Sequence, residues 1–297
     1  MAAEYRSLID LGRLRHVRSA EPGAVAGAFA SRRRRPVLGD DGRLLIVAAD
    51  HTARGVLTAG SRASLMADRA DLLGRLLVAL SHPGVDGVLA TADILDDLAL
   101  LGALDGRLAI GAVNRGGLDG AEFAIDDRIT AFSPVEAAAR GLDATKLLLR
   151  VRLDDDRSAA ALERAQGVVA QAAGVRQPVL IEPFLTAPGP GAPVNDMSAE
   201  AMMRAISIAS GIGPASEYSW LKIPVTEQFE RVMASTTLPA LLLGGDPLDD
   251  PDAIYARWRS ALDVPGVFGL AAGRSLLYPA DGDVERHVAI AAALVHG

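Results

Sequence analysis

The sequence predicts an α/β fold, a closed (β/α)8 barrel with an N-terminal helical extension. Eight short apolar segments lie along the chain, and helical patterns separate most of them. The first segment, residues 44–49, is continuously apolar, which indicates burial on both faces as in a parallel sheet. No Gly-x-Gly-x-x-Gly motif follows this segment, which weakens the alternative of an open, doubly wound sheet that binds a dinucleotide.

The expected strands are short apolar runs that end near turns or single polar residues. They are Leu44–Asp50, Val85–Ala90, Leu108–Val113, Ala144–Val151, Pro178–Phe184, Trp220–Val225, Pro239–Leu243 and Val267–Ala271. In a barrel of this kind, polar residues at the carboxyl ends of the strands converge on one mouth, where we expect the chemistry to lie.

Helical periodicity occupies the connections between these strands. Ser133-Pro134-Val135-Glu136 combines an N-cap serine, a proline in the first turn and a capping-box glutamate, and Asp250-Pro251 repeats the cap and the proline. The expected helices are Leu8–Val17, Ala63–Leu80, Ser158–Ala173, Ala199–Ala209, Asp252–Leu262 and Asp283–Val295.

Residues 1–40 do not fit the repeating unit, so we expect an N-terminal helical extension that covers the bottom of a barrel domain formed by residues 41–297. The run Arg32–Arg35 is expected to be a solvated helix end or a contact between subunits, in preference to a site for an anionic partner. The Pro- and Gly-rich loop Ala187–Asp196 follows the fifth strand. It either covers the mouth as a lid or is a plain surface loop.

Composition excludes several classes of function. The chain of 297 residues has a net charge of −7, which disfavours nucleic acid or an anionic membrane as the main partner. It has no cysteine, so disulfides and thiolate sites are excluded. The five histidines lack zinc-site spacing, and we expect no metal and no cofactor. Neither a signal peptide nor an apolar stretch of 18 residues is seen, so we expect a cytoplasmic protein.

Lysine use is the most informative feature of the composition. The chain has 30 basic residues, and of these only Lys146 and Lys222 are lysines, each inside an apolar, strand-like run. Lysine normally lies in solvent, and surface charge here is carried by arginine. A buried lysine, unlike arginine, can lose its proton and attack a carbonyl to form a Schiff base.

Two carboxylates accompany these lysines. Asp50 ends the first expected strand and Glu182 lies in the fifth, so all four side chains are expected to face one cavity. The structural alternative is a pair of buried salt bridges, which contribute little net stability. The functional interpretation makes Lys222 the nucleophile and Lys146 the neighbouring cation, while Glu182 and Asp50 transfer protons.

Two glycine-rich turns predict a phosphate site. Gly244-Gly245 follows the seventh strand and Gly273-Arg274 the eighth, where barrels commonly bind phosphate through backbone N–H groups. We therefore expect a phosphorylated small-molecule substrate. His51 is the one histidine near the predicted mouth, as a substrate contact or as a support for Asp50. Further mouth candidates, by strand position alone, are Asn114, Arg150, Thr186 and Thr226.

Over about residues 44–277, the ordered set of motifs resembles the class I aldolases that group tagatose-bisphosphate, archaeal-type fructose-bisphosphate and, more remotely, deoxyribose-phosphate aldolase. The motifs are Asp50-His51, Thr-Lys146-Leu-Leu-Leu, Ile-Glu182-Pro, Leu-Lys222-Ile-Pro and the two glycine turns. The resemblance implies a TIM-barrel lyase that cleaves a phosphorylated sugar or deoxy-keto sugar acid, including in inositol breakdown, and that forms homo-oligomers.

The chain departs from the archaeal branch at the fifth strand. Phe184 stands where that branch has a tyrosine, so the resemblance leaves proton transfer to Glu182. Two residues between His51 and Arg54 put the role of Arg54 in doubt. The alternatives to an aldolase are a thiolase-like acyl transferase acting on a phosphorylated diketone, and a barrel that binds sugar phosphates without turnover.

Overall fold

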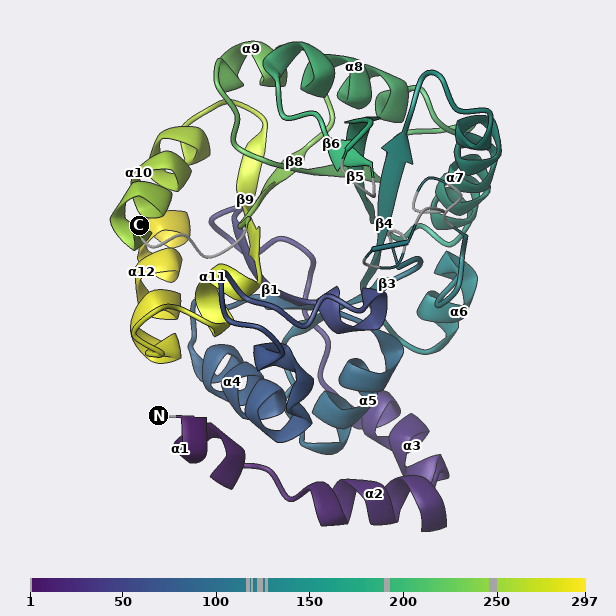
Figure 1. Cartoon of the computed structure of the whole chain (residues 1–297). Coiled ribbons are helices and arrows are strands. Elements are labelled where there is room, and N and C mark those ends of the chain that lie inside the picture. The colour runs from purple at the N-terminus through teal and green to yellow at the C-terminus, as the bar shows by residue number, and fades with distance from the viewer. Residues whose placement is uncertain are drawn as a thin grey trace.

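The computed structural model shows a closed barrel of eight parallel strands surrounded by helices (Figure 1). The structure describes residues 2–115, 118, 120–121, 125, 128–189, 193–245 and 250–297. Around the barrel the strands follow the order β1-β2-β3-β4-β5-β7-β8-β9, and pairing between β9 and β1 completes the ring. The predicted (β/α)8 TIM barrel is confirmed, and N-terminal helices precede it.

The eight barrel strands lie where the apolar segments predicted them, within a few residues at each end. They are β1 Leu44–Ala49, β2 Gly87–Ala90, β3 Leu108–Ala112, β4 Ala144–Val151, β5 Val179–Ala187, β7 Ser219–Ile223, β8 Ala240–Leu243 and β9 Val267–Ala272. A short strand, β6 Val194–Asn195, pairs antiparallel with the end of β5. The predicted loop after the fifth strand therefore folds back on that strand, and residues 190–192 within it lie outside the described residues.

Helices cover the outside of the barrel. They are α1 Ala2–Ser7, α2 Leu11–Ala20, α3 Gly23–Ser31, α4 Arg69–Ser81, α5 Ala92–Leu100, α6 Pro134–Ala139, α7 Arg157–Gly174, α8 Ala199–Ser210, α9 Phe229–Met233, α10 Pro251–Leu262, α11 Arg274–Leu277 and α12 Val284–His296, with 3₁₀ helices η1 His51–Arg54 and η2 Leu65–Ala67. The capping box at Ser133 and the N-cap at Asp250 are both present.

Two helix starts differ from the prediction because aspartate side chains cap them further along the chain. Asp68 accepts a hydrogen bond from the N–H of Asp71, so α4 begins at Arg69 and not at Ala63. In the same way Asp10 caps α2, which begins at Leu11. The residues immediately before α4 form η2 in place of the predicted first turns.

Side chains alternate along each strand between the barrel interior and the helical layer. The inward positions near the start of the strands form a small apolar cluster that includes Leu44, Ile46, Leu108, Leu180 and Leu241. The outward positions join the larger core between barrel and helices. The same inward positions continue up the strands toward the mouth, so a residue two places beyond this cluster points into the interior above it.

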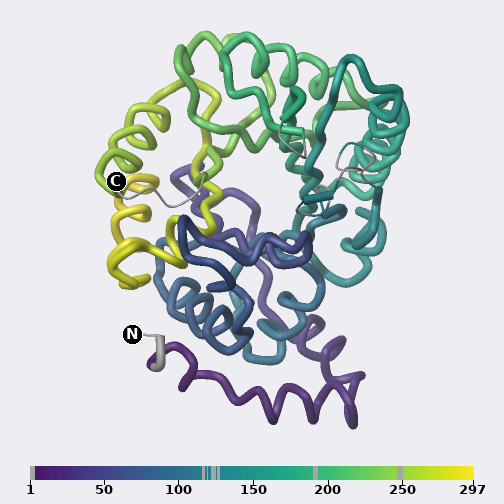
Figure 2. The backbone as a smooth tube through the Cα atoms, viewed as in Figure 1, coloured from purple at the N-terminus to yellow at the C-terminus, as the bar shows by residue number. Residues whose placement is uncertain are grey.

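The N-terminal helices lie along the outside of the barrel and not across its bottom (Figures 1 and 2). Helix α1 packs against α4, and α3 packs against α5. Only the segment after them reaches the bottom, where Val37 and Leu38 pack against the inner apolar cluster. The prediction that the helices cover the bottom is therefore wrong, and the domain boundary at residue 40 stays a prediction.

The arginine run joins this segment to the barrel through ion pairs within the chain. Its partners are aspartates that lie shortly before β2, β3 and β4. The pairs are Arg32–Asp143 (2.6 Å), Arg33–Asp105 (2.8 Å), Arg34–Asp143 (2.8 Å) and Arg35–Asp86. The run is therefore not simply a solvated helix end, because Arg32 is buried in its ion pair. The expected contact between subunits stays a prediction. Among the described helices, none is long and apolar enough to span a bilayer.

Candidate active site

Inward-facing positions of three neighbouring strands bring the predicted ionisable residues together. Lys146 on β4 and Glu182 on β5 each follow an inward apolar residue by two places, as Lys222 on β7 follows Trp220. The register between β5 and β7 pairs Leu180 with Trp220, which places Glu182 and Lys222 level with one another. Asp50 follows the end of β1.

Glu182 lies between the two lysines. Its Oε2 atom is 2.8 Å from Nζ of Lys146 and 3.1 Å from Nζ of Lys222. The Lys146 ammonium also donates a hydrogen bond of 2.9 Å to Oδ2 of Asp50. All four residues are buried. The predicted cluster of two lysines and two carboxylates therefore exists, with Lys146 held by two acids and Lys222 by one.

For Glu182, Asp50 and Lys146, the attraction of opposite charges outweighs the effect of burial on the pKa. Burial disfavours the charged form of Glu182, but the ammonium groups of Lys146 and Lys222 lower its pKa to about 2. Against the same burial effect, Lys146 lowers the pKa of Asp50 well below its usual range. For Lys146, burial is opposed by Asp50 and Glu182, which raise its pKa above the ordinary value. Lys146 is thus a fixed cation at neutral pH.

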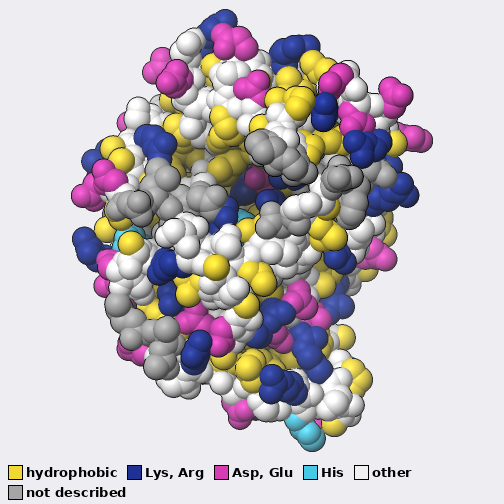
Figure 3. Space-filling view, viewed as in Figure 1, with side chains coloured by type: hydrophobic (Ala, Val, Ile, Leu, Met, Phe, Trp, Pro, Cys, Tyr) yellow, Lys and Arg dark blue, Asp and Glu magenta, His cyan; other side chains and the backbone are white. Residues whose placement is uncertain are grey.

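A cavity of about 250 Å³ opens at the carboxyl ends of the strands, and Lys222 and Glu182 line it. Lys146 and Asp50 are not among its lining residues and lie behind this pair. Figure 3 shows the hollow on the face of the barrel, with basic and acidic side chains visible inside it. The two lysines therefore differ in access: Lys222 lines the cavity, whereas Lys146 does not and is paired with Asp50 and Glu182.

The two glycine turns form one side of this cavity. Gly244, Gly245, Gly273 and Arg274 all line it. A Cβ atom on Gly273 would lie 2.3 Å from the carbonyl oxygen of Ala48, so only glycine fits there. Gly245 has a φ of +70°, a conformation that also favours glycine.

Three guanidinium groups give the cavity a positive wall. Arg274, Arg150 and Arg54 line it, and the Nε of Arg150 donates to Oδ1 of Asn195 (3.2 Å). The 3₁₀ helix η1 brings Arg54 to this wall, although the role of Arg54 was in doubt from the sequence. Arginine forks of this kind match the oxygens of phosphate or carboxylate groups. The sequence did not identify Asn195 as a residue of the mouth, because it reaches the mouth through the antiparallel pairing of β6 with β5.

His51 lines the cavity in a neutral form. Its Nδ1 atom is buried without a hydrogen-bond partner and lies 3.8 Å from Oδ1 of Asp50. Burial, together with the positive charges of Arg274, Arg54 and Lys222, lowers the pKa of His51 to about 3. A neutral imidazole at this position can donate a hydrogen bond to a substrate oxygen or accept one from a substrate hydroxyl.

The remaining mouth candidates do not line the cavity. Asn114 pairs both its amide atoms with the backbone of Leu148 (2.7 and 2.9 Å), which ties the end of β3 to β4. Thr186 donates to the carbonyl of Val151 (3.4 Å). Thr226 lies beyond the end of β7 and lines another cavity. The contacts of Asn114 and Thr186 with the backbone agree with the alternative that most of these candidates are structural.

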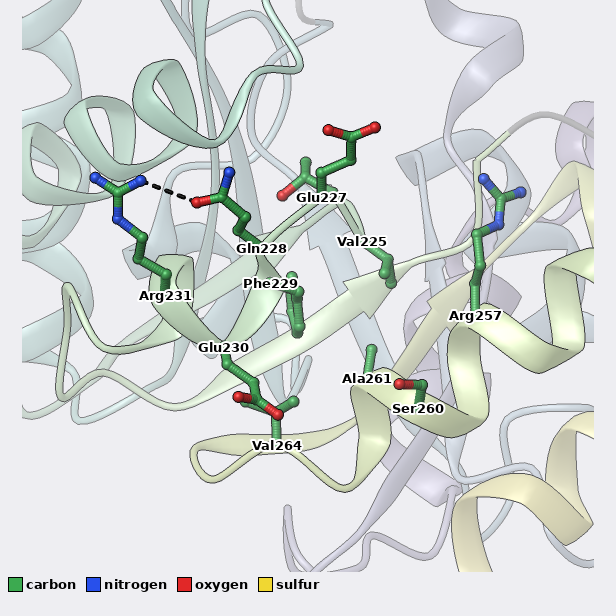
Figure 4. A pocket seen from close by; sticks show the side chains of 11 residues that line it. Val225, Glu227, Gln228, Phe229, Glu230, Arg231, Arg257, Ser260, Ala261 and Val264 are labelled. Carbon is green, nitrogen blue, oxygen red and sulfur yellow. Dashed lines mark hydrogen bonds between the residues drawn. The ribbon is translucent and has the colours of Figure 1, made fainter.

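A larger cavity of about 850 Å³ lies between α9 and α10, lined by residues such as Gln228, Phe229 and Arg257 (Figure 4). None of the four clustered ionisable residues reaches it. Within the described part of the chain, no group of histidine and acidic side chains could hold a metal ion. Of these two cavities, the smaller one at the strand ends is the one that Lys222 and Glu182 line.

Comparison with known proteins agrees with this geometry at the level of the fold. The sequence profile of the Cgl0159-like family matches residues 42–292. The crystal structure of Cgl0159 from Corynebacterium glutamicum is 50% identical over 96% of both chains, with a TM-score of 0.93. No curated protein matches the sequence.

Two aldolases share the fold at lower identity. A Schiff-base-forming fructose-1,6-bisphosphate aldolase is 20% identical, with a TM-score of 0.66 over 91% of this chain and 99% of its own. An archaeal fructose-1,6-bisphosphate aldolase is 20% identical, with a TM-score of 0.67 over 92% and 99%. The resemblance to the archaeal branch is confirmed in structure, and the tagatose and deoxyribose-phosphate branches remain predictions.

Proposed function

This chain belongs to the Cgl0159-like family, and we propose that it is a Schiff-base-forming aldolase that cleaves a phosphorylated sugar or sugar acid. One observation carries the proposal: of its two lysines, Lys222 faces the cavity beside Glu182, whereas Lys146 lies behind them. The barrel shared with a Schiff-base-forming aldolase supports it.

Lys222 acts as the nucleophile in this proposal. Its neutral Nζ adds to the substrate carbonyl carbon, and the carbonyl oxygen takes a proton to give a carbinolamine. Loss of that oxygen as water leaves an iminium ion on Lys222. The iminium accepts the electron pair of the breaking carbon–carbon bond and becomes an enamine, while the other fragment leaves as an aldehyde. Protonation of the enamine carbon and hydrolysis by water release the second fragment and restore the amine.

Glu182 carries the protons for these steps. It lines the cavity and its Oε2 atom lies 3.1 Å from Nζ of Lys222. As a carboxylate it can accept the proton that the amine loses on attack and pass it to the departing oxygen, and it can then accept the proton of the substrate hydroxyl. Phe184, on the same inward face of β5, has no acidic proton and can only pack against substrate. The carboxylate of Glu182 is therefore the proton carrier nearest to the nucleophile.

Lys146 and Asp50 support Glu182 from behind. The Lys146 ammonium keeps Glu182 ionised and fixes its orientation, and the same ammonium donates a hydrogen bond to Asp50, which holds it in place. Asp50 does not line the cavity, so we now assign it this supporting role in place of direct proton transfer to substrate.

The substrate phosphate binds at the glycine turns and Arg274. Gly244, Gly245, Gly273 and the guanidinium of Arg274 lie on one side of the cavity that Lys222 also lines. The N–H of Gly244 donates to the carbonyl oxygen of Ala271 (3.2 Å), so Arg274 and the N–H groups of the other two glycines are the proposed donors to phosphate. A phosphorylated carbonyl compound anchored there is held within the reach of the amine. Anchoring of this kind converts the attack into an intramolecular step.

Deuterium exchange into dihydroxyacetone phosphate tests this function directly. An enzyme that forms an enamine exchanges a hydrogen on the carbon next to the carbonyl with D₂O, which nuclear magnetic resonance detects. We expect exchange with the wild-type protein and none with Lys222→Arg. Binding of phosphorylated carbonyl compounds without exchange or cleavage would favour a non-catalytic barrel, and acyl transfer from a phosphorylated diketone would favour the transferase.

A further inference from the structure

A buried arginine connects the N-terminal helix to the phosphate side of the barrel mouth. Arg75 on α4 is 5% exposed in its side chain, and its guanidinium lies between two aromatic rings. The ring centre of Tyr5, on α1, is 4.4 Å from the guanidinium carbon, and that of Tyr278 is 4.7 Å from it. Both distances are within the range of cation–π interactions.

Polar contacts fix the same guanidinium to the end of α11. Nη1 of Arg75 donates a 2.8 Å hydrogen bond to the carbonyl oxygen of Leu277, the last residue of that helix. Nε donates a 2.8 Å hydrogen bond to Oδ2 of Asp71. Arg75 thus donates to a carbonyl at the C-terminal end of α11, and at the N-terminal end of the helix Gly273 and Arg274 line the cavity.

Helix α1 is fitted to this position. The backbone of Tyr5 crosses α4 so closely that a Cβ atom on Gly74 would lie 2.0 Å from the Tyr5 carbonyl oxygen. The Tyr5 hydroxyl donates to the carbonyl of Gly282 (2.9 Å) and accepts from the N–H of Val284 (3.2 Å). Tyr5 is therefore held both by α4 and by the chain that leads into α12.

We propose that Tyr5 and Arg75 are positioning residues for the active site: α1 encloses Arg75, Arg75 fixes α11, and α11 holds Arg274 at the phosphate side of the cavity. The residues of α1 do not touch the cavity, so they act only through this chain of contacts. The part that concerns phosphate rests on the proposed function, whereas the support of α11 does not.

The test compares three variants of the full-length protein. Tyr5→Leu removes the ring over Arg75, and Tyr5→Phe keeps the ring but loses the hydroxyl contacts. Phe29→Leu is the matched control, because it removes the ring that lies 5.0 Å from another arginine, Arg140, on the α3 side of the extension. The measurements are amide hydrogen exchange over residues 273–278, the Kd for dihydroxyacetone phosphate, and the deuterium exchange rate at saturation.

We expect Tyr5→Leu to speed amide exchange in α11 and to weaken binding by roughly three- to tenfold, in line with the loss of one cation–π contact, with little change in the saturated rate. Tyr5→Phe should stay closer to the wild type in both measurements. Phe29→Leu should leave α11 and ligand binding unchanged.

Equal amide exchange over residues 273–278 in Tyr5→Leu and Phe29→Leu would overturn the proposal, because Tyr5 would then have no specific effect on α11. Failure of the wild-type protein to bind dihydroxyacetone phosphate or inorganic phosphate would instead contradict the phosphate site of the proposed function. The amide-exchange comparison would still decide whether Tyr5 and Arg75 support α11.

Discussion

Lys222 and Glu182 lie level on adjacent strands, with Nζ of the lysine 3.1 Å from Oε2 of the glutamate. The same carboxylate oxygen lies 2.8 Å from Nζ of Lys146. One acid thus contacts a lysine that faces the cavity and a lysine that does not. This shared contact links a permanent cation to the amine that we assign to catalysis.

Glu182→Gln tests the proton carrier with an isosteric change. Because the amide cannot accept a proton at neutral pH, we expect the rate of deuterium exchange into dihydroxyacetone phosphate to fall by about 100- to 10,000-fold. The control is Glu285→Gln on the exposed face of α12, which should keep the wild-type rate. A Glu182→Gln protein with wild-type turnover would exclude Glu182 as the proton carrier.

Arg274→Met tests the anion site. Loss of a charge-assisted hydrogen bond of about 2 kcal/mol should weaken binding of dihydroxyacetone phosphate by roughly 30-fold, measured by calorimetry. Arg204→Met, an exposed arginine on α8, serves as the control and should bind normally. Equal affinities in the two variants would place the phosphate elsewhere.

His51→Gln tests the neutral imidazole through the pH dependence of stability. The folded-state pKa is about 3, and an unfolded histidine has a pKa near 6.5. Between these values the unfolded chain binds a proton that the native protein does not, so acidification from pH 7 to pH 4 lowers the free energy of unfolding.

The variant lacks this effect. We expect its loss of stability between pH 7 and pH 4 to be smaller than that of the wild type by about 3 kcal/mol, measured by urea denaturation at both values. His16→Gln, at an exposed position of α2, should show the wild-type loss. Equal losses in all three proteins would show that His51 becomes protonated in the folded state.

Arg32 and Arg33 offer a comparison of a buried and an exposed ion pair. The side chains of Arg32 and its partner Asp143 are both 3% exposed, whereas that of Arg33 is 82% exposed. Arg32→Ala leaves the buried carboxylate of Asp143 with a backbone N–H and one exposed arginine as partners, and we expect about 3 kcal/mol of destabilisation. Arg33→Ala should have no measurable effect on the denaturation midpoint. An Arg32→Ala protein with the wild-type free energy of unfolding would show that the arginine run does not hold the N-terminal segment.

Periodicity in the sequence was enough to predict the barrel and the central cluster. Each apolar strand is buried on both faces, and the two-residue alternation sets which side chains point inward, so Lys146, Glu182 and Lys222 could be placed in one interior from the sequence. The glycine turns were found because their positions after the last two strands are characteristic of phosphate sites in barrels.

Positions beyond the strand ends could not be predicted in the same way. Thr226 lies three residues after β7, where the alternation no longer applies, and it lines the cavity beside α9. Asn195 reaches the mouth only through the β5–β6 pairing. The partners of the arginine run lie about 50 to 110 residues away along the chain, a separation that no local pattern records.

The most direct test of the central claim is borohydride trapping with dihydroxyacetone phosphate, followed by mass spectrometry of the labelled peptide. The two lysines lie 76 residues apart, with arginine cleavage sites between them, so the adduct can be assigned without ambiguity. We expect a reduced adduct on Lys222 that disappears in Lys222→Arg, because a guanidinium cannot form the imine. An adduct on Lys146, or no adduct with this compound and related phosphorylated carbonyl compounds, would contradict the assignment of Lys222 as the Schiff-base residue.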